Sequence, residues 1–222
     1  KSLLRGLSSR PQLNRAALDQ VFTFWSTVGA ATLFEGVEQL PPGPLLVAED
    51  GRVRIERYWD WMFREPGDYR RGRVAELGRE LHDLLLDATR IRLRADVPVG
   101  AYLSGGLDST ALVALMCEGG VKPNTFSLAF TDPALDESEH QLAAAAHFGV
   151  NHRTIRVDTD HIRDGFVRTV WRAETPFLRC APIPLMALSG LAHRSDCKGV
   201  MTGEGAAEEF GGYDLSKDAK IR

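Results

Sequence analysis

The sequence has few cysteines, no long apolar run and no excess of basic residues. Cys117, Cys180 and Cys197 form no CxxC pair, which argues against a disulfide framework and a zinc knuckle. No apolar run can span a bilayer, and the start KSLLRGLSSRPQL lacks the features of a signal peptide. The net charge is −3 and the pI is about 6.1, so nothing indicates a nucleic-acid binder. We expect a cytoplasmic enzyme or binding domain with no nucleic-acid or membrane partner.

Several common catalytic and phosphate-binding motifs are also missing. There is no GxxxxGK[ST] loop, and the histidines form no HExxH or HxxxH pair. VMTGEGAAEE begins like a dinucleotide fingerprint, but Glu208 stands where the third glycine should be. The GxSxG elbow fails because Tyr102 replaces its first glycine.

The first third of the 222 residues has a helix and a hairpin pattern. Apolar residues recur at helical spacing from Asn14, a good N-cap, to about Val28. Two apolar runs then flank Asp50-Gly51, which predicts a β-hairpin. The polar, turn-rich stretch at 64–73 favours a domain boundary, so we expect an N-terminal segment at 1–73 and a second domain at 74–222.

The second part alternates between helical and strand-like patterns. A long amphipathic helix is predicted from Val74 to Ile91. The strand-like runs that follow are at 99–103, 125–130, 153–157 and 198–202. The helical stretches between them are 109–118, 136–148, 160–173 and 184–194. This alternation predicts an α/β fold with a doubly wound parallel sheet.

The strongest local signal is YLSGGLDSTALVALM at 102–116. Its residues Ser104 to Asp108 join a strand ending at Leu103 to a helix that we expect to open at Ser109. Ligands of α/β sheets collect at this edge. Gly105 and Gly106 let backbone N–H groups converge on an anion, and the helix start adds a positive dipole end. Hydroxyl donors are Ser104, Ser109 and Thr110.

Asp108 is the one residue of this turn that would repel phosphate. Its presence is explained if Mg²⁺ lies between carboxylate and phosphate, because Mg²⁺ prefers one or two carboxylates plus phosphate oxygens. The alternative is that Asp108 only caps the helix and that the glycines only form a tight turn.

The motifs together resemble one protein family. SGGLDS resembles the pyrophosphate loop of the ATP pyrophosphatase (PP-loop) superfamily. DVPVGAYLSGGLDST, TFSLAFTDPALDESEH and GEGAAEEFGGYD together resemble the synthetase domain of glutamine-hydrolysing asparagine synthetases. LFEGVEQLPPG and RYWD resemble the segment that joins that family's glutaminase domain to its synthetase domain. The resemblance covers nearly the whole chain.

The resemblance implies that ATP adenylates a carboxylate, usually that of aspartate, and that ammonia displaces AMP. It assigns the pyrophosphate and its Mg²⁺ to Ser104, Gly105, Gly106, Asp108 and Ser109. It assigns the adenosine site to Leu103, Leu128 and Gly203, and it places Glu204 beside the reacting acyl centre. Because related β-lactam synthetases usually have tyrosine at that position, Glu204 favours amidation between separate molecules.

Ala207 departs from the family pattern GEGADELFGGY, whose aspartate is the second Mg²⁺ carboxylate. The family has glutamate at the Glu208 position in any case, and one helical step turns a side chain by about 100°, which argues against simple replacement. Glu209 puts a charge where relatives pack an apolar residue. These changes indicate weakened metal binding, an engineered variant or an impaired relative; the alternative is that water completes the Mg²⁺ shell.

The family's glutaminase nucleophile is an N-terminal cysteine, whereas residue 1 here is lysine. The resemblance also places a catalytic lysine further downstream than Lys217 and Lys220. We therefore expect a chain truncated at both ends that receives ammonia from a glutaminase domain or a partner, and we leave a homodimer open. The rival hypotheses are a non-catalytic nucleotide-binding or partner-binding relative and a β-lactam or peptide macrolactam synthetase.

Overall fold

The computed structural model describes residues 1–62, 65 and 67–213. It divides into two compact units. Unit 1 contains Lys1–Arg71 and Phe166–Cys180, and unit 2 contains Gly72–Gly165 and Ala181–Arg222. The break at Arg71 lies in the polar stretch that we interpret as a boundary. Nothing in the sequence pattern assigned Phe166–Cys180 to the first unit.

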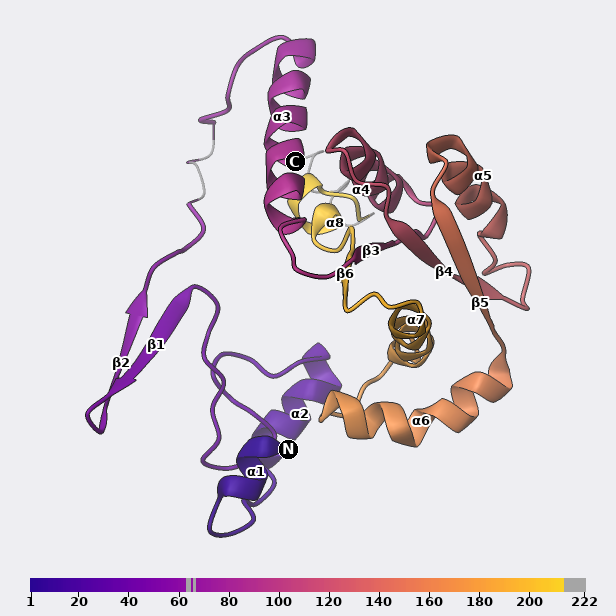
Figure 1. The fold of residues 1–222 in the computed structure, drawn as a ribbon. Coiled ribbons are helices and arrows are strands. Elements are labelled where there is room, and N and C mark those ends of the chain that lie inside the picture. The colour runs from indigo at the N-terminus through magenta and orange to yellow at the C-terminus, as the bar shows by residue number, and fades with distance from the viewer. Residues whose placement is uncertain (63–64, 66, 214–222) are drawn as a thin grey trace. The chain divides into compact units, whose positions relative to one another are not determined.

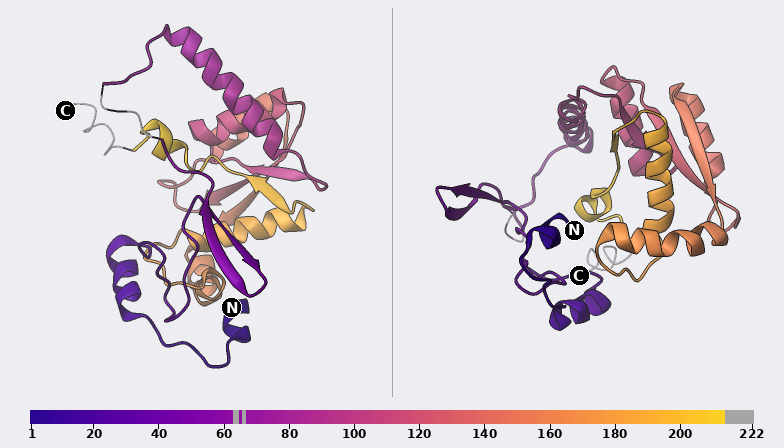
Figure 2. Two further views of the ribbon diagram at one scale, coloured as in Figure 1. Left: turned by 90° about the vertical axis from the view of Figure 1, so that its left-hand side faces the viewer. Right: turned by 60° about the horizontal axis from the view of Figure 1, so that its bottom comes forward.

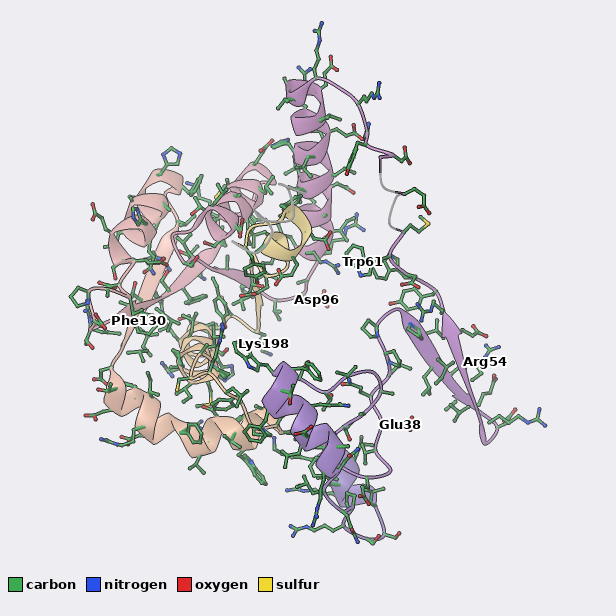
Figure 3. The ribbon with its side chains drawn as sticks, turned by 180° about the vertical axis from the view of Figure 1, so that it is seen from behind. Glu38, Arg54, Trp61, Asp96, Phe130 and Lys198 are labelled. Atoms are coloured by element: carbon green, nitrogen blue, oxygen red, sulfur yellow. The ribbon has the colours of Figure 1, made fainter. Side chains whose placement is uncertain are left out.

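Unit 1 is built from short elements with a small core. They are α1 (Ser2–Gly6), α2 (Arg15–Phe24), β1 (Pro44–Glu49) and β2 (Arg52–Arg57). The antiparallel pair β1–β2 confirms the hairpin, and its Asp50 and Gly51 both have positive φ, as the turn requires. Every residue of β2 is exposed, including Arg54, which is labelled in Figure 3. The core of this unit is Ala17, Val21 and Leu33.

Asn14 starts α2 as the sequence predicts. Its side-chain oxygen accepts a hydrogen bond from the backbone N–H of Ala17 at 3.1 Å. The helix ends at Phe24, earlier than the apolar spacing indicated, because Trp25 adopts the left-handed conformation.

Unit 2 is an α/β domain with a four-stranded parallel sheet. Its helices are α3 (Val74–Arg92), α4 (Leu107–Glu118), α5 (Ser138–Phe148), α7 (Pro182–Arg194) and α8 (Ala206–Phe210). Its strands are β3 (Val99–Tyr102), β4 (Asn124–Phe130), β5 (Asn151–Val157) and β6 (Gly199–Met201). Helix α6 (Thr159–Ala173) follows β5. The predicted helices and strands of this part are confirmed in type and order, although α4 starts earlier than expected.

The strand order β5-β4-β3-β6 shows double winding. The chain runs outward from β3 to β4 and β5, and then returns to place β6 on the other side of β3. Helices α4 and α5 cover one face of the sheet, and α7 covers the other (Figures 1 and 2). Apolar side chains fill both interfaces, with Leu103 and Met116 on the first and Phe126 and Leu188 on the second. The predicted α/β fold class is confirmed.

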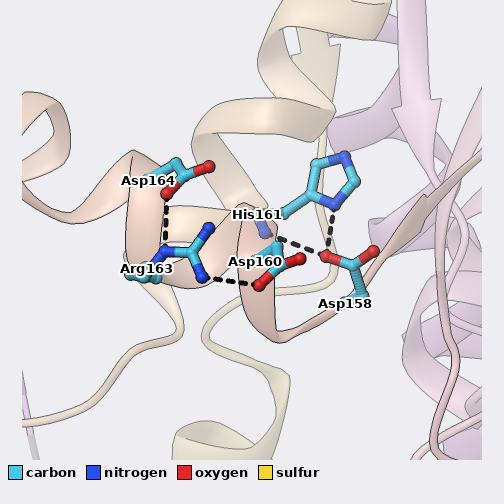
Figure 4. A network of polar contacts seen from close by, with 5 residues as sticks. All are labelled: Asp158, Asp160, His161, Arg163 and Asp164. Atoms are coloured by element: carbon cyan, nitrogen blue, oxygen red, sulfur yellow. Dashed lines mark hydrogen bonds and ion pairs between the residues drawn. The ribbon is translucent and has the colours of Figure 1, made fainter.

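Helix boundaries in unit 2 follow local chemistry. Gly149 ends α5 with a positive φ, as expected for a helix C-cap. Asp158 precedes α6, and its carboxylate accepts hydrogen bonds from the backbone N–H of His161 at 2.9 Å and from its ring (Figure 4). These bonds lower the pKa of Asp158, so the carboxylate is charged at the helix start.

Candidate functional site

The main cavity of unit 2 opens at the carboxyl ends of the sheet strands. It has a volume of about 310 Å³ and is lined by residues that follow β3, β4 and β6. Between β3 and β6 the winding of the sheet reverses direction. In doubly wound sheets ligands bind at this switch point. Phe130, the last residue of β4, also lines the cavity and is labelled in Figure 3.

The turn after β3 is held by its own hydroxyl groups. Ser109 Oγ accepts a hydrogen bond from the backbone N–H of Ser104 at 3.1 Å, and the two Oγ atoms are 2.9 Å apart. Ser104 Oγ also accepts from the N–H of Gly106 at 3.3 Å. These bonds bring Ser104 and Ser109 together at the cavity wall.

Gly105 is required by the shape of this turn. Its φ is +86°, and an added Cβ would lie only 2.9 Å from His140 Cβ and 3.1 Å from the backbone nitrogen of Gln141. Any side chain here would strain the backbone and push against α5. The turn is therefore packed directly against a neighbouring helix.

Helix α4 begins earlier than the sequence indicated. It starts at Leu107 with Gly106 as N-cap, so the expected start at Ser109 is wrong, and so is the alternative that Asp108 caps the helix. In the described part of the chain, no side chain caps this start. Asp108 is the second helical residue and is exposed on the cavity wall. The first turn of α4 can therefore offer backbone N–H groups to an anion.

Gly203, after β6, brings the opposite wall against this helix start. An added Cβ would lie 3.0 Å from Asp108 Cβ and 3.2 Å from the backbone nitrogen of Ser109. The absence of a side chain therefore lets the segment after β6 approach the first turn of α4.

Most of the residues singled out in the sequence meet in this cavity. Those that line it are Leu103, Ser104, Asp108, Ser109, Leu128, Gly203 and Glu204. Gly105, Gly106 and Thr110 are not among the lining residues. Gly105 and Gly106 shape the turn, and Thr110 Oγ1 is buried with no hydrogen-bond partner among the described residues. The proposed hydroxyl donation by Thr110 therefore has no support in the cavity geometry.

Gln141 is a cavity residue that the sequence reasoning missed. It is 3% exposed, and its Nε2 donates hydrogen bonds to the carbonyl oxygens of Leu128 at 2.9 Å and Ser104 at 3.4 Å. It thus connects the turn after β3 to the second half of β4. The available signal was weak: a single amide on the buried face of α5, one helical turn before Ala145.

The cavity wall is strongly acidic. Its carboxylates are Asp108, Glu137, Glu204 and Glu208, and the described residues that line it include no lysine, arginine or histidine. Tyr213 donates a hydrogen bond from its hydroxyl to Glu208 Oε1 at 2.7 Å, and this bond lowers the pKa of Glu208. This bond therefore orients the Glu208 carboxylate and favours its anionic form.

A second, more apolar cavity is lined by residues of α3, α4, α8 and the segment that leads from β6 to α8. Its lining includes Leu85, Leu112, Phe210 and Glu209. Asp108 reaches both cavities, whereas Ser104 and Ser109 line only the first.

Among the described residues, no three or more His, Cys, Asp or Glu side chains are grouped so that they could hold a metal ion. Mg²⁺ bound together with phosphate needs only one or two carboxylates. Lys217 and Lys220 lie outside the described residues. Within the described chain, no helix is long and apolar enough to cross a membrane.

The fold and cavity define a doubly wound α/β domain with a glycine-containing turn at its switch point. The chain belongs to the asparagine synthase family, whose model matches residues 80–222. The matched range includes most of unit 2 and the Phe166–Cys180 segment of unit 1. It confirms the family resemblance seen in the sequence.

Curated relatives and one solved structure illustrate the similarity. Amidase chry2 of Gibberella zeae is 31% identical over 84% of this chain and 30% of its own length. Asparagine synthetase [glutamine-hydrolyzing] 1 of Bacillus subtilis is 27% identical over 93% of this chain and 32% of its own length. The glutamine-dependent NAD⁺ synthetase structure from Acinetobacter baumannii, in complex with ADP, has a TM-score of 0.46 and 19% identity, covering 67% of this chain and 30% of that one. The chain thus spans about a third of the length of these relatives.

Proposed function

We propose that unit 2 binds ATP with Mg²⁺ and activates a carboxylate as an acyl-adenylate for amidation. The observation that carries this proposal is the cavity at the switch point, where the Ser104–Asp108 turn, the start of α4 and Gly203 meet. Membership of the asparagine synthase family supports it.

In this proposal the triphosphate lies against the turn after β3. The N–H groups in the first turn of α4 and the hydroxyls of Ser104 and Ser109 contact phosphate oxygens. The adenosine lies against Leu103, Leu128 and Gly203, next to the apolar side chains of Phe126 and Leu188. Gln141 holds the two sides of this site at a fixed spacing.

The reaction has two displacement steps. A carboxylate oxygen attacks the α-phosphorus of ATP, an O–P bond forms, and the bond to the β-phosphate oxygen breaks, so that pyrophosphate leaves. The amine nitrogen then attacks the acyl carbon, a C–N bond forms, and the acyl C–O bond breaks to release AMP. Glu204, on the cavity wall, accepts the proton that the amine loses.

The donor set of the cavity fits a magnesium ion bound together with phosphate. Asp108 is the carboxylate of the Ser104–Asp108 turn itself. An acidic cavity without lysine or arginine among its described lining would repel a bare triphosphate. When bound, Mg²⁺ neutralises phosphate charge and helps pyrophosphate to leave.

Aspartate as the acid and ammonia as the amine are the substrates that family membership favours. In this proposal residues 1–73 join unit 2 to a glutaminase domain, which supplies the ammonia. These assignments concern the whole protein. The present chain covers only about a third of the length of its relatives.

ATP–pyrophosphate exchange tests this function. The complete protein is incubated with labelled pyrophosphate, ATP, Mg²⁺ and candidate acids, beginning with aspartate. Exchange is expected to depend on the acid and to be lost in Asp108→Ala. Robust exchange that Asp108→Ala leaves unchanged would overturn the assignment of the site.

Ala207 supports a second candidate, a relative that binds nucleotide without turnover. It lines the cavity but offers no ligand oxygen. This candidate predicts nucleotide binding without exchange in the natural protein, and gain of exchange in Ala207→Asp. Exchange in the natural protein with the expected acid excludes it.

A further inference from the structure

Ala207 stands where the family has the aspartate that is its second Mg²⁺ ligand, so another residue must supply that carboxylate if the cation keeps two. The two candidates, Glu208 and Glu209, are neighbours on α8 and carry the same group. Their sequence positions do not distinguish them, but the cavities that their side chains reach do.

The helical rotation of α8 separates the two glutamates. Ala207 and Glu208 line the main cavity, whereas Ala206 and Glu209 line the apolar cavity between α3 and α4. This division follows from a turn of about 100° per residue, which puts positions 206 and 209 on one side of the helix. Glu208 therefore lines the same cavity as Ala207, where the family has its aspartate, and Glu209 does not.

The Ser104–Asp108 turn indicates in which of the two cavities the cation would lie. A cation that joins Asp108 to phosphate oxygens must lie where Asp108, Ser104 and Ser109 face a common space, which is the main cavity. The Glu208 side chain is one methylene group longer than that of aspartate. Its carboxylate can therefore extend further toward the cation from the helical position next to Ala207. The Tyr213 hydroxyl bonds to Oε1 at 2.7 Å, and this second contact orients the carboxylate as metal ligands commonly require.

We propose that Glu208 supplies the second carboxylate for the divalent cation of this site, in place of the aspartate that is absent at Ala207. The proposal rests on the proposed function, because it takes a nucleotide-bound cation at Asp108 as its starting point. It assigns no such role to Glu209, which lines the more apolar cavity together with Arg92.

The test measures cation affinity and not turnover. Mn²⁺ binding to the complete protein is followed by electron paramagnetic resonance of the free ion, with the α,β-methylene analogue of ATP present so that no reaction occurs. Glu208→Gln and Glu209→Gln form a matched pair, since each removes one charge with little change of shape. Asp108→Asn serves as the reference for loss of a ligand, and thermal melting checks that each variant is folded.

Glu208→Gln is expected to weaken Mn²⁺ binding at least tenfold, because even residues that only support a metal ligand contribute about 10–100-fold. Glu209→Gln is expected to leave the affinity nearly unchanged. The double variant Ala207→Asp/Glu208→Gln should regain affinity, since it returns a carboxylate to the same wall.

Two results would overturn the proposal in different ways. If Asp108→Asn weakens binding but Glu208→Gln matches Glu209→Gln, the site exists and Glu208 is not its ligand. If Asp108→Asn also binds Mn²⁺ like the natural protein, the cation site of the proposed function is itself wrong, and the role of Glu208 falls with it.

Discussion

Substituting alanine for Gly203 tests the close approach that builds the site. The new methyl group would lie 3.0 Å from Asp108 Cβ, 3.1 Å from the Asp108 carbonyl carbon and 3.2 Å from the Ser109 nitrogen. All three distances are shorter than an ordinary carbon contact of about 3.5–4.0 Å, so the segment after β6 and the start of α4 must move apart. Two of these atoms belong to the backbone and cannot rotate away.

The expected cost follows from overpacking. Inserting a methylene-sized group into a packed region costs about 1–3 kcal/mol, and the backbone contacts favour roughly 2 kcal/mol. For a chain of this size about 1 kcal/mol lowers the melting temperature by roughly 2–4 °C. We therefore expect the α/β unit to melt roughly 4–8 °C lower, with weaker binding of ATP analogues, because both walls of the cavity shift.

Gly199 provides the matched control. It lies in β6, the strand that leads to Gly203, and an added Cβ at Gly199 meets nothing within 4 Å. Gly199→Ala should leave melting unchanged or raise it slightly, because alanine reduces the freedom of the unfolded chain. Calorimetry of the complete protein compares the two variants. If they melt at the same temperature, the close packing of Gly203 against Asp108 is refuted.

Three further predictions concern other contacts. Gln141→Leu removes both Nε2 hydrogen bonds but also an acceptor, Oε1, that is buried with no partner in the described part of the chain. The net loss should be about 1–2 kcal/mol in urea unfolding, and an unchanged midpoint would contradict this. His82 has a raised pKa, first because Glu118 bonds to it at 2.9 Å and then because of Asp83. A raised pKa stabilises the fold below the unfolded value of about 6.5 and ceases to do so as pH rises through the folded value. The stability difference between the natural protein and His82→Gln should therefore be largest below the unfolded pKa and shrink as the pH rises through the raised folded pKa; a constant difference would argue against the contact. Asn14→Ala removes the cap of α2 and should cost about 1 kcal/mol, whereas Asn14→Asp, which retains the acceptor, should cost little.

Local chemistry allowed much of the fold to be predicted from the sequence. The cap at Asn14, the left-handed Gly149 and the turn at Asp50-Gly51 each act within a few residues, so their stretches of sequence specify them. The alternation of strands and helices likewise indicated a parallel sheet. The start of α4 was placed too late because Gly106 caps it without a side chain to signal the position.

The cavity depends on segments far apart in the chain. Ser104, Gly203 and Glu208 were recognisable as motif residues, but their meeting follows from the placement of β6 beside β3. No local pattern could show that Gln141 on α5 bonds to both sides of the site. The same holds for the segment Phe166–Cys180, which packs with unit 1.

The sequence by itself determined most of the elements, the glycine-containing turn after β3 and the absence of a carboxylate at Ala207. Only the tertiary structure decided that Glu208 lines the main cavity and that Glu209 lines the more apolar one. The physical reason is that hydrogen bonds and periodicity within an element are local. Which wall a helical side chain reaches depends, in contrast, on how α8 is packed against the rest of the domain.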